Sequence, residues 1–108
     1  MKPKCKAWVV FPGGTKFGQG RADLLRLVAE EGSLKGAVER MGMSYRAAWG
    51  YLRELERAAG FPFLERKGRG PAAGTRLTPR AIEFLDAFDA YRERLDGAAA
   101  RAFRASFR

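Results

Sequence analysis

The chain has 108 residues, a formal net charge of +9 and a hydrophobic content of 46%. This length fits one domain, and this hydrophobic content excludes a disordered polymer. The chain lacks an apolar run of about 18 residues, which excludes a transmembrane helix. The apolar stretch 7–11 is too short for the core of a signal peptide, so we expect a cytoplasmic protein without a membrane partner.

The positive charge is concentrated in two parts of the chain. Residues 1–20 contain four lysines and no acidic residue, and residues 44–80 contain eight basic residues against three acidic ones. The remaining parts, 21–43 and 81–108, are balanced, with four against four and five against five. A surface that neutralises phosphates explains this segregation, whereas a chance basic face is the alternative. The distribution favours a nucleic-acid partner.

The first predicted element is an N-terminal strand at 4–11, because Cys5 to Phe11 is rich in valine and aromatic residues. Pro12-Gly13-Gly14 ends this strand. The following residues, 17–20, are interpreted as a continuation of the loop.

A three-helix core is predicted over 20–59. Apolar residues recur at helical spacing in its first helix, which ends at Gly32, and Ser33 caps a short second helix. Gly42 separates that helix from the third, which Ser44 caps. The inward faces expected for the three helices are Leu24, Leu25, Leu27 and Val28; Leu34, Ala37, Val38 and Met41; and Ala48, Leu52, Leu55 and Ala59. Two short helices joined by a glycine turn predict a helix-turn-helix.

A β-hairpin wing is predicted over 61–77, with two strands around a loop rich in glycine and proline at 68–74. Thr78-Pro79 then marks the start of a long C-terminal helix over 78–105. The predicted fold class is therefore mainly α with a small β-hairpin wing. It is a winged helix-turn-helix over 1–108, with a long C-terminal dimerisation helix.

The exposed face of the third helix is the predicted DNA-reading surface. A recognition helix places its N-terminal residues against base edges in the major groove. We expect Arg46 to bond guanine O6 and N7, the commonest specific contact. Trp49 is expected to pack on sugar or on a thymine methyl group, and partial burial in the core is its alternative role. The DNA-contacting residues predicted on this helix are Ser44, Tyr45, Arg46, Trp49 and Arg53.

The wing supplies a second set of basic residues. Basic side chains on a flexible glycine loop suit contacts with phosphates or with the minor groove, which position a protein without specifying sequence. A solvated loop kept basic for solubility is the alternative. The DNA-contacting residues predicted on the wing are Arg66, Lys67, Arg69 and Arg76.

The C-terminal helix carries an apolar seam with heptad spacing, which is typical of a helix that pairs with a partner helix. The residues predicted for a homodimer interface are Phe84, Phe88, Tyr91 and Leu95. A helix that packs only on its own core is the alternative. A dimer would double the DNA contacts and match a palindromic site.

The run Ser44-Tyr45-Arg46-Ala47-Ala48-Trp49, preceded by Gly42-Met43, resembles the recognition helix of ModE-type molybdate-responsive regulators. Leu64-Glu65-Arg66, the glycine-rich loop and Leu77-Thr78 resemble the same family, over roughly 5–96 in all. A looser pattern, formed by 37–56 followed by Phe63-Leu64-Glu65-Arg66, is similar to LysR-type regulators. The resemblance implies a dimeric winged-helix regulator of molybdenum-related genes, with DNA contacts at Ser44, Tyr45, Arg46, Trp49, Arg66 and Lys67.

Full-length members of that family carry oxyanion-binding domains after the DNA-binding domain. No residue of the present sequence matches those domains, so direct molybdate sensing by this chain is not expected.

The sequence lacks the residues that the common catalytic and metal-binding sites require. Histidine is absent and Cys5 is the only cysteine, which excludes His-based metal sites and serine–histidine or cysteine–histidine catalysis. We therefore expect no enzyme activity, cofactor or metal. Two other functions remain open: a protein-docking winged helix whose terminal helix pairs with another regulator, and an architectural DNA binder without sequence preference.

Overall fold

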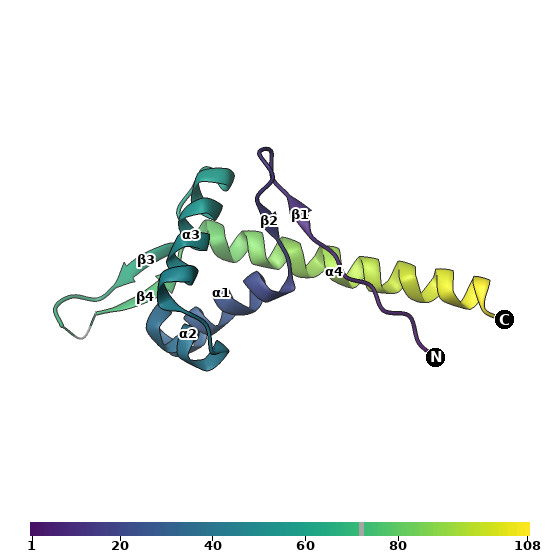
Figure 1. Ribbon diagram of the computed structural model, residues 1–108, viewed down its shortest axis with the longest axis horizontal. Coiled ribbons are helices and arrows are strands. Elements are labelled where there is room, and N and C mark those ends of the chain that lie inside the picture. Colours follow the sequence, from purple (N-terminus) through teal and green to yellow (C-terminus); the bar gives the residue numbers. More distant parts are fainter. Residues whose placement is uncertain (72) are drawn as a thin grey trace.

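The computed structural model describes residues 1–71 and 73–108, which form four helices and two small antiparallel hairpins (Figure 1). In chain order the elements are β1 (Val9–Val10), β2 (Lys16–Phe17), α1 (Gln19–Glu31), α2 (Leu34–Met41), α3 (Tyr45–Ala59), β3 (Leu64–Lys67), β4 (Gly74–Leu77) and α4 (Pro79–Ser106). The predicted order of helices and wing is thereby confirmed. Ala72, which belongs to the loop predicted at 68–74, lies outside the described residues.

The N-terminal strand is shorter than predicted and has a partner that the sequence analysis missed. Only Val9–Val10 is strand, and it pairs antiparallel with Lys16–Phe17, which had been interpreted as loop. Gly13 and Gly14 lie at the turn, each with φ of 97°. The pairing brings Phe17 inward, where it is fully buried. A two-residue strand carries too little alternation to be recognised from sequence.

Caps and glycines define the three helices of the core as expected. The Ser33 Oγ accepts a hydrogen bond from the Gly36 N–H at 3.0 Å, and the Ser44 Oγ accepts one from the Ala47 N–H at 3.2 Å. Gly42 has φ of 67°, a left-handed conformation that lets the chain turn directly from α2 into α3. The glycine turn between two capped helices is therefore the cause of the helix-turn-helix.

The wing is attached to the body at both of its strands. The Thr75 N–H donates to the Gly32 carbonyl at 2.8 Å, which joins β4 to the end of α1. A Cβ added at Gly74 would lie 2.5 Å from that same carbonyl oxygen, so this approach requires glycine. Thr78, which caps α4 through the Ala81 N–H, also donates its hydroxyl to the Pro62 carbonyl at 2.7 Å. The base of the wing is thus held rigidly against the helices.

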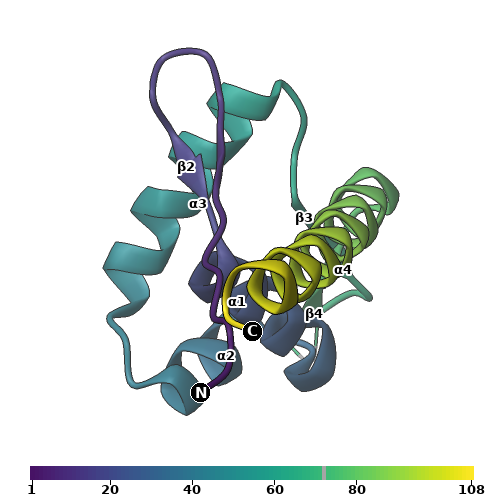
Figure 2. The ribbon, with the colours of Figure 1, turned by 90° about the vertical axis from the view of Figure 1, so that its right-hand side faces the viewer.

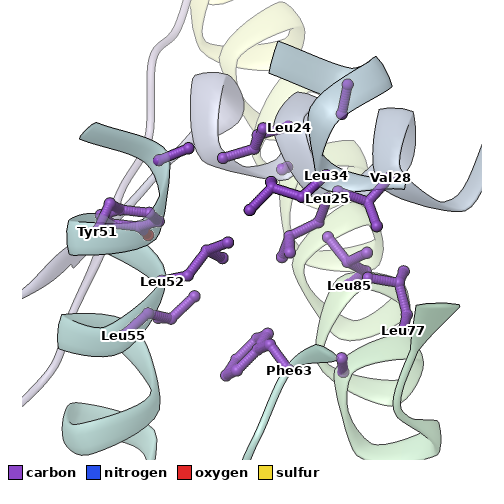
Figure 3. Packing of buried hydrophobic residues seen from close by; sticks show 14 of the residues in the cluster. Leu24, Leu25, Val28, Leu34, Tyr51, Leu52, Leu55, Phe63, Leu77 and Leu85 are labelled. Atoms are coloured by element: carbon purple, nitrogen blue, oxygen red, sulfur yellow. The ribbon is translucent and has the colours of Figure 1, made fainter. Parts of the chain in front are cut away.

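The core lies where the three core helices, the N-terminal hairpin, the base of the wing and the first turns of α4 meet. Figure 3 shows Leu25 of α1 and Leu52 and Leu55 of α3 directed into a space that Phe63 and Leu85 border. Met41 is 37% exposed, so the prediction that it faces inward is wrong. It is the last residue of α2, and its side chain is only partly covered.

The C-terminal half of α4 projects beyond this core (Figure 1). The radius of gyration is 16.4 Å, against about 13 Å for a compact domain of this length. Phe88 is the last buried residue of the helix, and the 18 residues that follow it extend about 27 Å at 1.5 Å per residue. We use the term projecting half for residues 89–106.

The apolar seam of α4 divides at this point, and half of its predicted interface needs correction. Phe88 is 3% exposed and packs edge-on against Phe17, with ring centroids 5.1 Å apart. Phe84 is partly buried and contacts the rings of Phe17 and Phe63. Phe88 is therefore a core residue of its own chain, and Phe84 packs against that core. The N-terminal hairpin covers them, and that hairpin was not predicted.

Candidate nucleic-acid interface

Helix α3, the predicted recognition helix, turns one face to the core and leaves the other uncovered. Ala48, Leu52 and Leu55 are fully buried, whereas all of the DNA-contacting residues predicted on this helix are exposed. The hydroxyl of Ser44 already accepts a bond as the helix cap. Ser44 thus has a structural role as the helix cap, and its hydroxyl group can still donate a hydrogen bond to a ligand.

An aromatic and cationic ridge follows the exposed face of α3. Tyr45 and Trp49 meet edge to face, with centroids 6.3 Å apart, and they are 48% and 37% exposed. The Arg53 guanidinium lies 5.8 Å from the Trp49 ring centroid, within cation–π range. Trp49 is therefore a partly exposed surface residue, supported on both sides by its helix neighbours.

The start of α3 and the wing border one hollow of about 430 Å³. Tyr45 and Trp49 form one wall and Arg66 stands on the wing side. The α2 side contributes Lys35, which the sequence analysis did not single out. The remaining lining residues are Ser33, Leu34, Leu64, Glu65, Gly70, Ala73, Gly74 and Thr75. Of the nine predicted DNA-contacting residues, the structure brings Tyr45, Trp49 and Arg66 together at this hollow. The other six do not line it.

The basic residues of the wing differ in their surroundings. Arg76 pairs with Glu65 across the hairpin at 2.7 Å, so part of its charge is compensated. Arg66 donates to the Gly70 carbonyl at 3.3 Å, a bond that spans the loop. Lys67 and Arg69 are exposed, and neither takes part in an ion pair among the described residues. Lys67 and Arg69 are consequently the most available cations of the wing.

The helix starts that face this surface carry positive charge where a folded protein usually places acids. Neither α2 nor α3 has an acidic residue in its first turn, and Lys35 and Arg46 lie there instead. A cation at the positive end of a helix dipole costs about 0.3–1 kcal/mol when exposed. Cations at these helix starts therefore destabilise the isolated chain slightly, but they can stabilise a complex with an anion. A basic residue in the first turn of a helix without an acidic one is visible in the sequence, and this pattern would have identified Lys35.

The N-terminal hairpin braces α3 from behind. Tyr51, which the sequence analysis did not assign to the core, is 7% exposed, and its hydroxyl donates to the Lys16 carbonyl at 3.3 Å. Burial raises the pKa of Tyr51 to about 12, opposed by the Arg21 guanidinium, which lies 3.5 Å from the ring centroid. Thr15 also donates to Glu54 at 3.1 Å. The orientation of α3 therefore depends on contacts with the hairpin as well as with the core.

Comparison with known proteins agrees with this architecture. Residues 21–82, more than half of the chain, match the model of the bacterial regulatory helix-turn-helix protein, lysR family. A chain from the crystal structure of the CbnR_DBD–DNA complex is similar in fold, with a TM-score of 0.58 and 29% identity. That similarity covers 81% of the present chain and 94% of the other.

A curated relative is the molybdenum-pterin-binding protein MopB of Rhodobacter capsulatus. It is 30% identical over 78 residues, which are 71% of this chain. The chain spans 29% of the length of that relative. The match is consistent with the resemblance noted from the recognition helix and the wing.

No helix in the described part of the chain combines the length and apolar character needed to cross a membrane. The matched family model extends from α1 through the wing to the first turns of α4, so it contains the whole candidate interface. The chain belongs to the LysR family of bacterial regulatory helix-turn-helix proteins and is a DNA-binding domain of a transcriptional regulator.

Proposed function

We propose that this chain is a homodimeric, sequence-specific regulator that reads double-stranded DNA with α3 and holds the flanking backbone with the wing. The observation that carries the proposal is the hollow between the first turn of α3 and β3. Two aromatic side chains and two cations, Lys35 and Arg66, line it, together with Glu65, which Arg76 neutralises. A duplex presents bases and phosphates side by side, and this surface offers partners for both.

Base reading falls to the first turns of α3. Arg46 is exposed there and forms no ion pair among the described residues, so its guanidinium is available for guanine O6 and N7. Trp49, steadied by Tyr45 and Arg53, offers an apolar edge suited to a thymine methyl group. Ser44 and Tyr45 supply hydroxyl donors for phosphates or base edges.

Positioning falls to the wing. Lys67 and Arg69 suit phosphate or minor-groove contacts because their charges are uncompensated by neighbours within the described chain. Arg66 shares the hollow with α3 and suits the phosphate nearest the reading helix. Arg76 contributes least, because Glu65 already neutralises part of its charge.

Dimerisation falls to the projecting half of α4. Tyr91 is 41% exposed and Phe107 is 61% exposed, and Leu95 and Phe103 lie between them with only partial cover. Tyr91 and Leu95 continue the heptad spacing of the seam beyond the core, as a helix that pairs with another helix does. Phe103, and Phe107 just beyond the projecting half, add further apolar surface. Correcting for the burial of Phe84 and Phe88, we assign the contact to Tyr91, Leu95 and the apolar residues after them.

The controlled genes are proposed to concern molybdenum. This part of the proposal rests on the relative named as molybdenum-pterin-binding and on the ModE-like residues of α3 and the wing.

Selection of genomic fragments by the purified protein tests the proposal, at about 150 mM salt so that pure phosphate attraction is weakened. We expect a palindrome whose half-sites lie about one helical turn apart. The matched Arg46→Ala variant should recover a broader set of sequences. Recovery of unrelated fragments would indicate architectural binding, and recovery of none would indicate a protein-docking module.

A further inference from the structure

The N-terminal residues 2–8, here called the basic arm, carry positive charge to which the proposed function assigns no role. It carries a lysine at every second position (Lys2, Lys4 and Lys6) and no acidic residue. All three lysines are exposed, and the arm precedes β1 without belonging to any helix or strand. An extended cationic segment of this kind suits the backbone of a nucleic acid.

The arm is held against the body by its last residue. The indole of Trp8 covers Gly18, where an added Cβ would lie 2.6 Å from the Trp8 Cδ1 atom. Gly18 directly precedes α1, so this contact ties the arm to the start of the first helix. From there the arm runs beside the projecting half of α4 (Figure 1).

A hollow of about 320 Å³ lies between the arm and α4. Its lining residues are Lys4, Cys5, Lys6, Ala7, Trp8, Gln19, Gly20 and Arg92. Three of these are cations and none is an acid, while the amide of Gln19 donates to the Asp23 carboxylate at 2.7 Å. Cations from the arm and from α4 thus border one concave site, whose charge suits a phosphate group.

The position of this hollow relates it to the DNA path. Arg92 follows Tyr91 on the part of α4 that the proposed function assigns to the dimer contact. If the proposed dimer has a two-fold axis at that contact, its two hollows lie between the two helix-turn-helix units. Viewed along α4, the arm passes on the same side as α2 and α3 (Figure 2). In the proposed dimer this arrangement brings the hollow beside the duplex that joins the two half-sites.

We propose that this hollow binds a backbone phosphate of the DNA between the half-sites, with Lys4, Lys6 and Arg92 as its cations. The inference rests on the proposed dimeric, DNA-reading function. It gives the basic arm the task of holding the operator centre, while α3 and the wing hold its ends.

The experiment uses the full chain and duplexes that carry the selected palindrome. One duplex has ordinary phosphates, a second has uncharged methylphosphonates between the half-sites, and a third has them beyond the outer ends. We expect the unmodified protein to bind the second duplex on the order of tenfold more weakly than the first. The Lys4→Gln/Lys6→Gln variant should show that same loss on the first duplex and no further loss on the second.

Two controls define the site. Lys2→Gln removes the same charge from the same arm at a residue that does not line the hollow, and it should leave the response to methylphosphonates intact. The double variant should lower the slope of log affinity against log salt by about 1.8, the value for two phosphates per dimer.

The results of these binding experiments distinguish failure of the phosphate site from failure of the proposed function. If the unmodified protein binds the palindrome but loses nothing on the second duplex, or if the double variant is as sensitive to methylphosphonates as the unmodified protein, the phosphate site is wrong and the reading function stands. If no sequence is selected at all, both proposals fail.

Discussion

The packed body of the molecule and the projecting half of α4 contain similar apolar residues in very different surroundings. Phe88 and Leu85 of α4 are 3% and 4% exposed, whereas Tyr91, one turn further along the same stripe, is 41% exposed. The helix is continuous through this point. The difference arises because the N-terminal hairpin, α1 and the wing cover only the first turns of α4. Periodicity therefore identifies an apolar face, and the neighbouring elements decide whether that face is core or contact surface.

Truncating one residue on each side of the boundary gives the largest expected difference. Phe88→Ala should lower the free energy of unfolding by about 3–5 kcal/mol, because a buried ring that contacts Phe17 is lost. Leu95→Ala, measured in the same urea titration at low protein concentration, should lower it by less than about 1 kcal/mol. Equal losses would mean that the projecting half belongs to the core.

Introducing charge on the projecting half tests its role in assembly. Tyr91→Glu/Leu95→Glu should yield monomers in sedimentation, because two carboxylates would be buried in a helix pair. Affinity for the palindrome should fall on the order of a hundredfold or more, since the two half-sites then bind independently. The far-ultraviolet circular dichroism should remain unchanged, which separates dissociation from unfolding. An unchanged sedimentation mass would contradict the assignment.

Two arginines of the packed body separate reading from positioning. Arg46→Ala should reduce discrimination between the selected site and a mutated site by roughly 1–3 kcal/mol. Arg69→Ala should weaken binding to every sequence similarly and make the salt slope shallower by about one. Competition assays at two salt concentrations measure both quantities. Sequence-independent loss with Arg46→Ala would remove its proposed role as a base reader.

The smallest expected effect concerns the brace between the hairpin and α3. The pKa of Tyr51 is raised from 10.0 to about 12 in the folded chain, so only the unfolded state releases this proton between those values. The stability due to Tyr51 should accordingly be complete below pH 10 and decline above it. In urea unfolding, the stability gap between the unmodified protein and Tyr51→Phe should be wider at pH 8 than at pH 11. A gap that does not change with pH would contradict the burial of the phenol.

The features that sequence predicted correctly are local ones. Ser33, Ser44 and Thr78 cap their helices, and Gly42 adopts a left-handed conformation, because each depends on a few adjacent backbone groups. The wing strands lie within a residue or two of their predicted positions. For the candidate interface, the exposed face of α3 follows from the inward spacing of its apolar residues.

The features that sequence did not predict are produced by contacts between distant segments. Lys16–Phe17 is a strand only because Val9–Val10 lies beside it. Tyr51 is buried because that same hairpin covers it, and Lys35 joins the interface because the wing folds back beside α2. No local pattern contains this information.

The sequence by itself determined the helix-turn-helix, the wing, the exposed basic face of α3 and the family, because caps, glycines, helical spacing and charge act over short stretches of chain. Only the tertiary structure decided where the core ends along α4, which aromatic residues remain available to a partner, and which cations converge. Those outcomes depend on which surfaces cover one another, and burial is a property of the folded chain as a whole.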